Sequence, residues 1–308
     1  MPDITFKIVE SYELSPYVED LRALEAGMSY PLDDDTFIID HGEDYHPFFS
    51  EMGAARFLLV LVDGVVLGTM AGVWREVEIA GVSTTSVYLG DFKLAKSLRG
   101  GEVARKLAMH VLREWWQRPT LGGWNLVFGA AMRGDRGDVM RTTVGSGYHA
   151  GRLLEPMAKQ VLYFVSPAEL AKVSSRGEPL WTTEYADLTP GAGEGVERTD
   201  GRKDFQLQST GKPWPLAHLP LAPQRCPLGY GEYLRRCART LIEQDLSSGR
   251  RSIACFGLDA RATHAIGWLE RHGLEPGARC TLYGVHFPGA AHPSIHEVPY
   301  VHLSTAMI

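Results

Sequence analysis

The chain has 308 residues, of which 44% are hydrophobic and 22% are charged, the balance of a globular protein with room for two domains. Its net charge of −6 argues against a general nucleic-acid binder and suits a cationic or amine substrate. No apolar run approaches the roughly 20 residues that cross a bilayer, and the first residues lack the basic start and apolar block of a signal peptide. We therefore expect a cytoplasmic protein with no membrane partner.

The cysteines point to the same compartment. All four lie in the last third of the chain and none forms a Cys-x-x-Cys pair, so neither a zinc ribbon nor a redox motif is indicated. We expect buried, reduced thiols. They are Cys226, Cys237, Cys255 and Cys280.

The first predicted elements are a strand over residues 5–11, where apolar and polar residues alternate, and a helix over residues 15–28. Residues 30–49 are rich in acids, histidines and aromatics, and we expect a solvated acidic loop that can attract an amine. One group in this loop lacks any known metal-ligand spacing, so we expect no metal site. Its members are Asp40, His41, Glu43, Asp44 and His46.

An antiparallel meander follows. Residues 56–74 predict a hairpin about Asp63-Gly64, and the second strand continues to a turn near Gly81. The next strand covers residues 84–95 and enters Arg99-Gly100-Gly101, after which apolar residues recur at helical spacing. The glycine turn leaves the first amides of this helix unobstructed, and with the helix dipole they form an anion site that suits a pyrophosphate.

The remainder of the chain predicts a second α/β unit. Strands are expected at residues 124–131 and 157–165, and residues 174–201 have the Gly, Pro, Thr and acid content of a linker. The later elements are short strands at residues 205–209 and 216–221, helices at 230–246 and 260–272, and strands at 252–258 and 279–287. We predict an N-terminal domain over residues 1–168, a linker over 169–201 and a smaller C-terminal domain over 202–308.

At residues 99–104 the sequence resembles the GNAT N-acetyltransferase superfamily, whose pyrophosphate loop has the pattern Arg/Gln-x-x-Gly-x-Gly/Ala. Arg99 and Ala104 match the ends of this pattern, Gly100 is a frequent occupant of its second position, and Glu102 replaces its central glycine. The meander before this loop and the helix after it also match the family. The resemblance implies an α/β (α+β) fold with a mixed, mostly antiparallel sheet flanked by helices, in tandem with a second, truncated and degenerate GNAT-like unit.

The resemblance further implies that acetyl-CoA is the donor and that no metal takes part. Backbone amides near three residues would orient the pantetheine and the thioester carbonyl, and the family exposes this backbone with a bulge, here expected at Gly90-Asp91. These residues are Lys93, Leu94 and Ala95. The residues that would hold the pyrophosphate are Arg99, Gly100, Gly101, Glu102, Val103 and Ala104. The stretch from Arg225 to Gly231 resembles a second such loop with one residue too many, and is a reserve site for CoA.

Acetyl transfer to an amine needs a base, donors that polarise the thioester and an acid for the leaving thiolate. Asp91 is the first candidate for the base or for an amine anchor, with Glu76 and Glu78 as alternatives. Tyr148 is the candidate acid, since the family often uses a tyrosine on or after its fourth helix. The sequence has no Gly-x-Ser-x-Gly elbow, so a covalent mechanism is not indicated.

The predicted function is an N-acetyltransferase that moves an acetyl group from acetyl-CoA to a primary amine of a small molecule by direct transfer in a ternary complex. One alternative uses a longer acyl-CoA or an acyl carrier protein as donor, because the Glu102 carboxylate is unfavourable beside a pyrophosphate. Another is a catalytically silent acyl-CoA-binding module that regulates a partner. The acceptor and the oligomeric state stay open.

Overall fold

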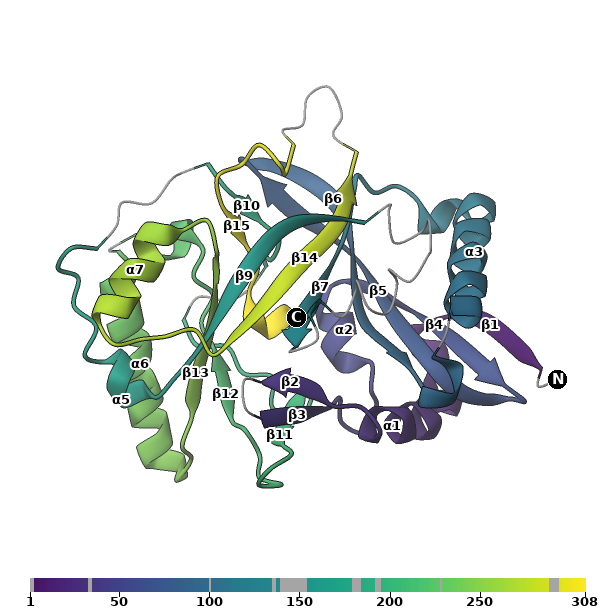
Figure 1. Ribbon diagram of the computed structural model, residues 1–308, viewed down its shortest axis with the longest axis horizontal. Coiled ribbons are helices and arrows are strands. Elements are labelled where there is room, and N and C mark those ends of the chain that lie inside the picture. Colours follow the sequence, from purple (N-terminus) through teal and green to yellow (C-terminus); the bar gives the residue numbers. More distant parts are fainter. Residues whose placement is uncertain are drawn as a thin grey trace.

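One large sheet runs through the whole molecule. The computed structural model describes residues 3–32, 35–99, 101–134, 137–138, 154–178, 184–191, 195–227, 229–287 and 294–308. Within these residues the sheet has twelve strands, most of them antiparallel, and its main path runs β1-β4-β5-β6-β7-β14-β9-β13-β12. A three-stranded sheet of order β11-β3-β2 lies beside it (Figure 1).

The first four strands of the path form the predicted meander. They are β1 (Ile4–Glu10), β4 (Ala54–Val62), β5 (Val65–Ile79) and β6 (Val82–Leu94). Both hairpin turns have two consecutive residues with positive φ, Asp63-Gly64 at 50° and 87° and Ala80-Gly81 at 49° and 78°. This is the backbone of a type I′ turn, which matches the twist of the strands that it joins. The predicted hairpin positions are confirmed.

The remaining elements also agree with most sequence predictions. The later strands are β7 (Leu126–Gly134), β8 (Gly137–Asp138), β9 (Glu155–Val165), β10 (Ala186–Asp187), β11 (Asp204–Leu207), β12 (Leu216–His218), β13 (Ile253–Asp259), β14 (Ala278–His286) and β15 (Val301–His302). The helices are α1 (Val18–Ala26), α2 (Pro47–Met52), α3 (Gly101–Gln117), α5 (Pro167–Leu170), α6 (Tyr230–Ser248) and α7 (Thr263–Arg271).

The two halves of the chain share strands. β14, from the last third, pairs with β7 on one side and with β9 on the other. β9 in turn pairs with β13, and β13 with β12. β14, from the last third of the chain, therefore extends the sheet of the first half. β9, which comes earlier in the sequence, lies between β14 and β13. The domain boundaries at residues 168 and 201 stay a prediction, because hydrogen bonding continues across the sheet from one half to the other.

Alternation along the strands separates the two faces of the first half. Phe57 and Leu59 of β4 belong to a core that includes Leu21 of α1 and Phe49 of α2. The intervening Leu58 and Val60 pack with Leu107 of α3. Because successive side chains of a strand point to opposite faces, α1 and α2 cover one face and α3 covers the other.

The second half has its own core beneath α6 and α7. Leu234 and Leu241 of α6, together with Trp268 of α7, pack against the β9 and β13 side chains Tyr163 and Phe256. In Figure 1 these helices lie at the opposite end of the molecule from α3. All four cysteines are free and buried, as expected.

The acidic segment is more ordered than the sequence suggested. β2 (Tyr30–Leu32) and β3 (Asp35–Asp40) pair with each other, and β11, which follows much later in the sequence, pairs with β3 as a third strand. Glu43 and Asp44 are exposed, as a solvated loop requires. The loop prediction is wrong for His41 and Tyr45, which are 2% and 0% exposed and pack among aromatic rings.

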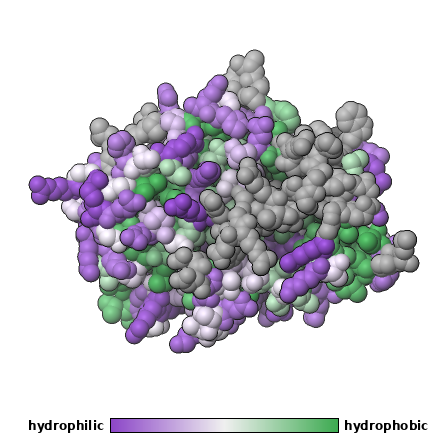
Figure 2. Space-filling model, in the orientation of Figure 1, coloured by the Kyte–Doolittle hydropathy of each residue, from purple (hydrophilic) through white to green (hydrophobic). Residues whose placement is uncertain are grey.

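The surface carries few clues to a partner. Figure 2 shows polar side chains spread over the visible face with smaller apolar areas between them. Within the described residues, no helix is both long and apolar enough to cross a lipid bilayer.

Candidate active site

The strand β6 carries a bulge at Asp91. β5 and β6 pair as Ala71 with Gly90 and then as Thr69 with Lys93, so two residues of β6 lie opposite one of β5. Asp91 has a φ of 56°. The left-handed backbone is uncommon for a residue other than glycine, and a bulge is a feature that accommodates it. The bulge that the sequence predicted at Gly90-Asp91 is confirmed.

β6 and β7 separate at the same point. They pair in parallel over only three residues, ending with Tyr88 opposite Phe128. Just beyond, Gly129 lies so close to β6 that a Cβ there would be 2.6 Å from the Leu89 carbonyl oxygen. From Gly90 onward the β7-facing edge of β6 has no strand partner among the described residues. This edge leads to Arg99 and the first turn of α3.

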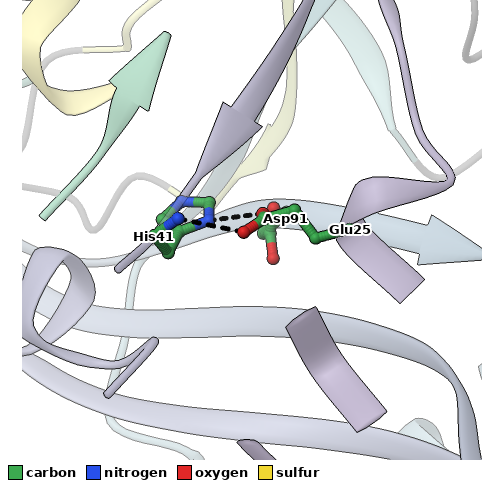
Figure 3. A group of neighbouring side chains, drawn as sticks. All are labelled: Glu25, His41 and Asp91. Carbon is green, nitrogen blue, oxygen red and sulfur yellow. Dashed lines mark hydrogen bonds and ion pairs between the residues drawn. The ribbon is translucent and has the colours of Figure 1, made fainter. Parts of the chain in front are cut away.

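Ionisable side chains gather on the α1 face of the bulge. Asp91 accepts a hydrogen bond from the Tyr45 hydroxyl, and its Oδ1 lies 2.5 Å from the Lys93 ammonium. The same ammonium pairs with Glu25 of α1. Glu25 also accepts from the His41 backbone amide at 2.9 Å and contacts the His41 Nδ1 at 2.6 Å. Figure 3 shows the His41 ring facing the Glu25 and Asp91 carboxylates.

The pairing keeps both carboxylates ionised. Burial alone raises the pKa of Asp91 and of Glu25, but the nearby Lys93 and His41 and the hydrogen bonds that these carboxylates accept outweigh it and hold both pKa values below their usual range. Burial likewise lowers the pKa of Lys93, yet the two carboxylates raise it above its ordinary value. A carboxylate with a lowered pKa is a weak proton acceptor, so Asp91 fits the role of an anchor better than that of a base.

The three side chains Glu25, His41 and Asp91 have the composition of a metal site, and their ligand atoms lie within 4.8 Å of one another. The Lys93 ammonium already bridges the two carboxylates. A divalent cation between the same oxygens would meet this positive charge at contact distance, and like charges so close repel strongly. The donor set therefore does not fit a metal while Lys93 is protonated.

The predicted pyrophosphate residues lie where the loop enters α3. The Arg99 side chain is exposed, and its Nε donates to the Leu94 carbonyl at 3.1 Å. Gly101, Glu102, Val103 and Ala104 form the first turn of α3, and Gly100 lies outside the described residues.

The strand residues before this loop are already partly engaged. Leu94 packs in the α3 core. The Ala95 amide donates to the Leu67 carbonyl at 2.8 Å, so this amide is not free to orient a ligand.

The predicted catalytic residues do not all come together. Glu76 is exposed, and it accepts hydrogen bonds from Ser83 at 2.7 Å and from Thr85 at 2.8 Å. On β5, Glu76 points to the opposite face of the sheet from its neighbours Arg75 and Val77. The ionisable cluster lies on the Arg75 and Val77 face, so Glu76 is separated from Asp91. Glu78 is half-buried further along the same strand, opposite Asp187 of β10. Tyr148 lies outside the described residues.

The reserve CoA loop has a different character. Arg225 is 8% exposed and donates to the Thr189 and Pro190 carbonyls at 3.0 and 2.9 Å. The Glu178 carboxylate accepts a hydrogen bond from the Tyr230 backbone amide at the start of α6. A Cβ on Gly229 would lie 2.6 Å from Glu178 Oε1, so the carboxylate fills the space next to this helix start. The loop binds an anion of its own chain.

An open cleft of about 970 Å³ has one member of the ionisable cluster, Glu25, in its lining. One wall is α1 with Glu25, another is β3, and the segment from Thr199 to Gln206 with Trp214 closes the remaining side. Lys203 of this segment is 5% exposed and lines the cleft. The sequence reasoning missed Glu25, His41, Tyr45 and Lys203 as site residues. The one available signal was a histidine and a tyrosine inside an aromatic-rich segment.

No family model matches the chain, and no curated protein sequence matches it. Several solved structures match it over nearly its whole length, among them the following two. A tandem GNAT protein from the clavulanic acid biosynthesis pathway has a TM-score of 0.54 at 10% identity, over 94% of this chain and 100% of its own. An N-myristoyltransferase of Saccharomyces cerevisiae with bound myristoyl-CoA and inhibitors has a TM-score of 0.51 at 10% identity, over 97% and 86%.

The chain therefore has the GNAT fold in a tandem arrangement, and the predicted mixed, mostly antiparallel sheet is confirmed. At this level of identity the likeness concerns the fold.

Proposed function

We propose that the protein is an N-acyltransferase that takes an acyl group from acyl-CoA, with acetyl-CoA as the first donor to test, and transfers it to a primary amine of a small molecule. The observation that carries the proposal is the position of the β6 bulge. It frees a strand edge that ends at Arg99 and the first turn of α3, and it holds buried ionisable groups on the opposite side. A thioester along this edge would lie between a pyrophosphate site and an acceptor site.

The reaction needs one proton removed and one supplied. The amine nitrogen attacks the thioester carbonyl carbon, a C–N bond forms, the C–S bond breaks, and the electron pair leaves on the CoA sulfur. The amine gives up one proton and the thiolate takes one up, directly or through water. We assign the acceptance of the amine proton to His41, because Glu25 contacts its Nδ1 at 2.6 Å and orients its ring.

Asp91 has a different proposed role. Its carboxylate is ionised and held by Lys93 and Tyr45, so it fixes the bulge and attracts the amine. Tyr148 stays the predicted acid for the thiolate.

The first test is thermal melting with acetyl-CoA, CoA and a long-chain acyl-CoA. A ligand at a hundred times its dissociation constant adds about 2.7 kcal/mol to the free energy of unfolding. We expect a shift in the wild type that Arg99→Ala largely removes and that Arg113→Ala, an exposed arginine of the same helix, leaves intact. No shift with any CoA species would overturn a CoA donor, and a carrier protein would become the donor to test.

The second test is release of free thiol from acyl-CoA on addition of primary amines. Thiol release that requires the amine supports transfer, whereas binding without release favours the silent module. We expect His41→Gln to lower kcat by about 10²- to 10⁴-fold while acyl-CoA still shifts the melt. An unchanged kcat in this variant would remove His41 from the chemistry.

A longer acyl donor is the second candidate. The S. cerevisiae N-myristoyltransferase, which shares the fold, binds myristoyl-CoA. Glu102 in the first turn of α3 also disfavours a pyrophosphate held as closely as in the family pattern. A melting shift confined to the long-chain acyl-CoA would favour this candidate over acetyl-CoA.

A further inference from the structure

Lys203 is a buried ammonium with no anionic partner among the residues that the structure describes. It precedes β11 in a turn that its own backbone closes, with its amide and carbonyl both bonded to Thr199 at 2.8 Å. Its side chain contacts two aromatic rings, with Nζ 4.5 Å from the centre of Phe48 and 5.5 Å from that of Phe205. Among the described residues, no carboxylate forms an ion pair with it and no group accepts a hydrogen bond from it.

The contrast with Lys93 defines what is missing. Lys93 is equally buried and has two carboxylates and a tyrosine hydroxyl around its ammonium. Lys203 has only the faces of two rings, and a cation–π contact recovers a small part of the cost of taking an ammonium out of water. Burial accordingly lowers the pKa of Lys203 to about 8, against the opposing effect of Asp91 and Glu25. An ammonium in this setting is ready to accept an anion.

The cleft has Lys203 in its lining. Lys203 and Glu25 both line it, so the cleft offers a positive group and a negative group. Its other charged lining residues are mixed in sign, with acids slightly in excess. They are Glu19, Arg22, Asp40, Asp200, Asp204, Arg250 and Arg251. A dianionic phosphate would meet this acidic excess, whereas a monoanionic carboxylate matches the single charge of Lys203.

We propose that Lys203 binds a carboxylate of the acceptor, so that the acceptor is an amine that also bears a carboxylate, as a free amino acid does. The inference rests on the proposed function for the amine half of the acceptor. The carboxylate site itself rests only on Lys203 and the cleft. The acceptor would place its carboxylate at Lys203 and its amine toward Glu25 and His41. Lys203 is then a substrate-binding residue contributed by the segment that follows the predicted linker.

The test compares acceptors that differ only in the carboxylate. Free amino acids are assayed for thiol release from acyl-CoA, each against the primary amine that lacks its carboxylate. A hydrogen bond to a charged group is worth enough that its loss lowers kcat/KM by about ten- to a hundredfold. We expect this preference in the wild type and its loss in Lys203→Met. Lys212→Met, an exposed lysine just after the same strand and outside the cleft lining, should keep it.

Folding of the variant is checked by its melting temperature. Lys203→Met removes a buried, unpaired charge and should melt no lower than the wild type. If it fails to fold, Lys203→Gln replaces it, since glutamine is neutral and of similar length. A wild type with no preference for the carboxylate, or a preference that survives both substitutions, would overturn the proposal.

Binding of amino acids alone separates this inference from the proposed function. We expect amino acids without acyl-CoA to raise the melting temperature of the wild type and not of Lys203→Met. That result, with no effect of any acyl-CoA, would support the carboxylate site and reject acyl-CoA as the donor. Acyl-CoA binding and amine-dependent thiol release without any role for Lys203 would do the reverse.

Discussion

The helices α3 and α6 begin in similar sequence and in different surroundings. Each follows an arginine and glycines, and each resembles a pyrophosphate loop. At α6 the arginine is buried against backbone carbonyls, and the Glu178 carboxylate accepts an amide of the first turn. At α3 the arginine is exposed and the preceding strand has separated from its neighbour. The comparison teaches that a loop pattern alone does not make a ligand site, because at α6 a carboxylate of the same chain occupies the helix start.

Removing the cation of the buried ionisable cluster at the β6 bulge should give the largest loss of stability. Lys93→Met would leave Glu25 and Asp91 buried without their shared cation, and breaking a buried ion pair costs about 3–5 kcal/mol. We expect the free energy of unfolding in urea to fall by this amount. Lys96→Met, an exposed neighbour, should change it by less than about 0.5 kcal/mol. Equal effects of the two substitutions would contradict the buried network.

The two arginines should differ when each is removed. Arg225→Ala removes the donor of two backbone carbonyls and the cation beside the buried Asp187, so we expect a loss of about 3–5 kcal/mol. Arg99→Ala removes an exposed side chain and should cost less than about 0.5 kcal/mol. Urea unfolding of both variants measures the difference. A large loss in Arg99→Ala would make that arginine structural and weaken its assignment to a ligand.

The burial of the Lys203 ammonium should make the free energy of unfolding depend on pH. Its native pKa of about 8 lies below the ordinary 10.5, so between these values the unfolded chain binds a proton that the native protein does not. The contribution of Lys203 to wild-type stability therefore rises with pH across this window. At pH 7 we expect Lys203→Met to be more stable than the wild type by roughly 3 kcal/mol, an advantage that disappears by about pH 10.5.

Urea unfolding at pH 7 and pH 10 measures this dependence, with Lys212→Met as the control that should follow the wild type at both values. A less stable Lys203→Met at pH 7 would mean that the ammonium gains more from its surroundings than its contacts with Phe48 and Phe205 provide.

A substitution at the start of α6 should give the smallest loss of stability. It also tests directly whether Glu178 is what distinguishes this helix start from that of α3. Glu178→Ala removes a carboxylate from the first turn, which costs about 1 kcal/mol. The emptied site should then accept an inorganic anion, so added sulfate should restore more stability to this variant than to the wild type. Glu243→Ala, exposed on the same helix, is the control. If sulfate stabilises all three proteins equally, Glu178 does not block an anion site.

Local patterns in the sequence were enough for most of the fold. The Asp63-Gly64 and Ala80-Gly81 turns, the alternation in the meander and the apolar spacing of α3, α6 and α7 each depend on neighbours in the chain. The GNAT resemblance also rested on a short segment, residues 99–104, and the bulge at Asp91 was expected from that resemblance. Such features are recognisable because turn geometry and helical periodicity are set within a few residues.

The tertiary structure decided which residues meet. Glu25 comes from α1, His41 from the end of β3, and Asp91 and Lys93 from β6, and no spacing in the sequence relates these three elements. Lys203 arrives from the other side of the linker, and β14 enters the first sheet from the last third of the chain. These contacts depend on long-range packing and on burial, which determine whether a charge finds a partner. The sequence by itself identified a GNAT-like loop, and the folded chain decided that a second such loop is closed and that one buried lysine belongs to the lining of an open cleft.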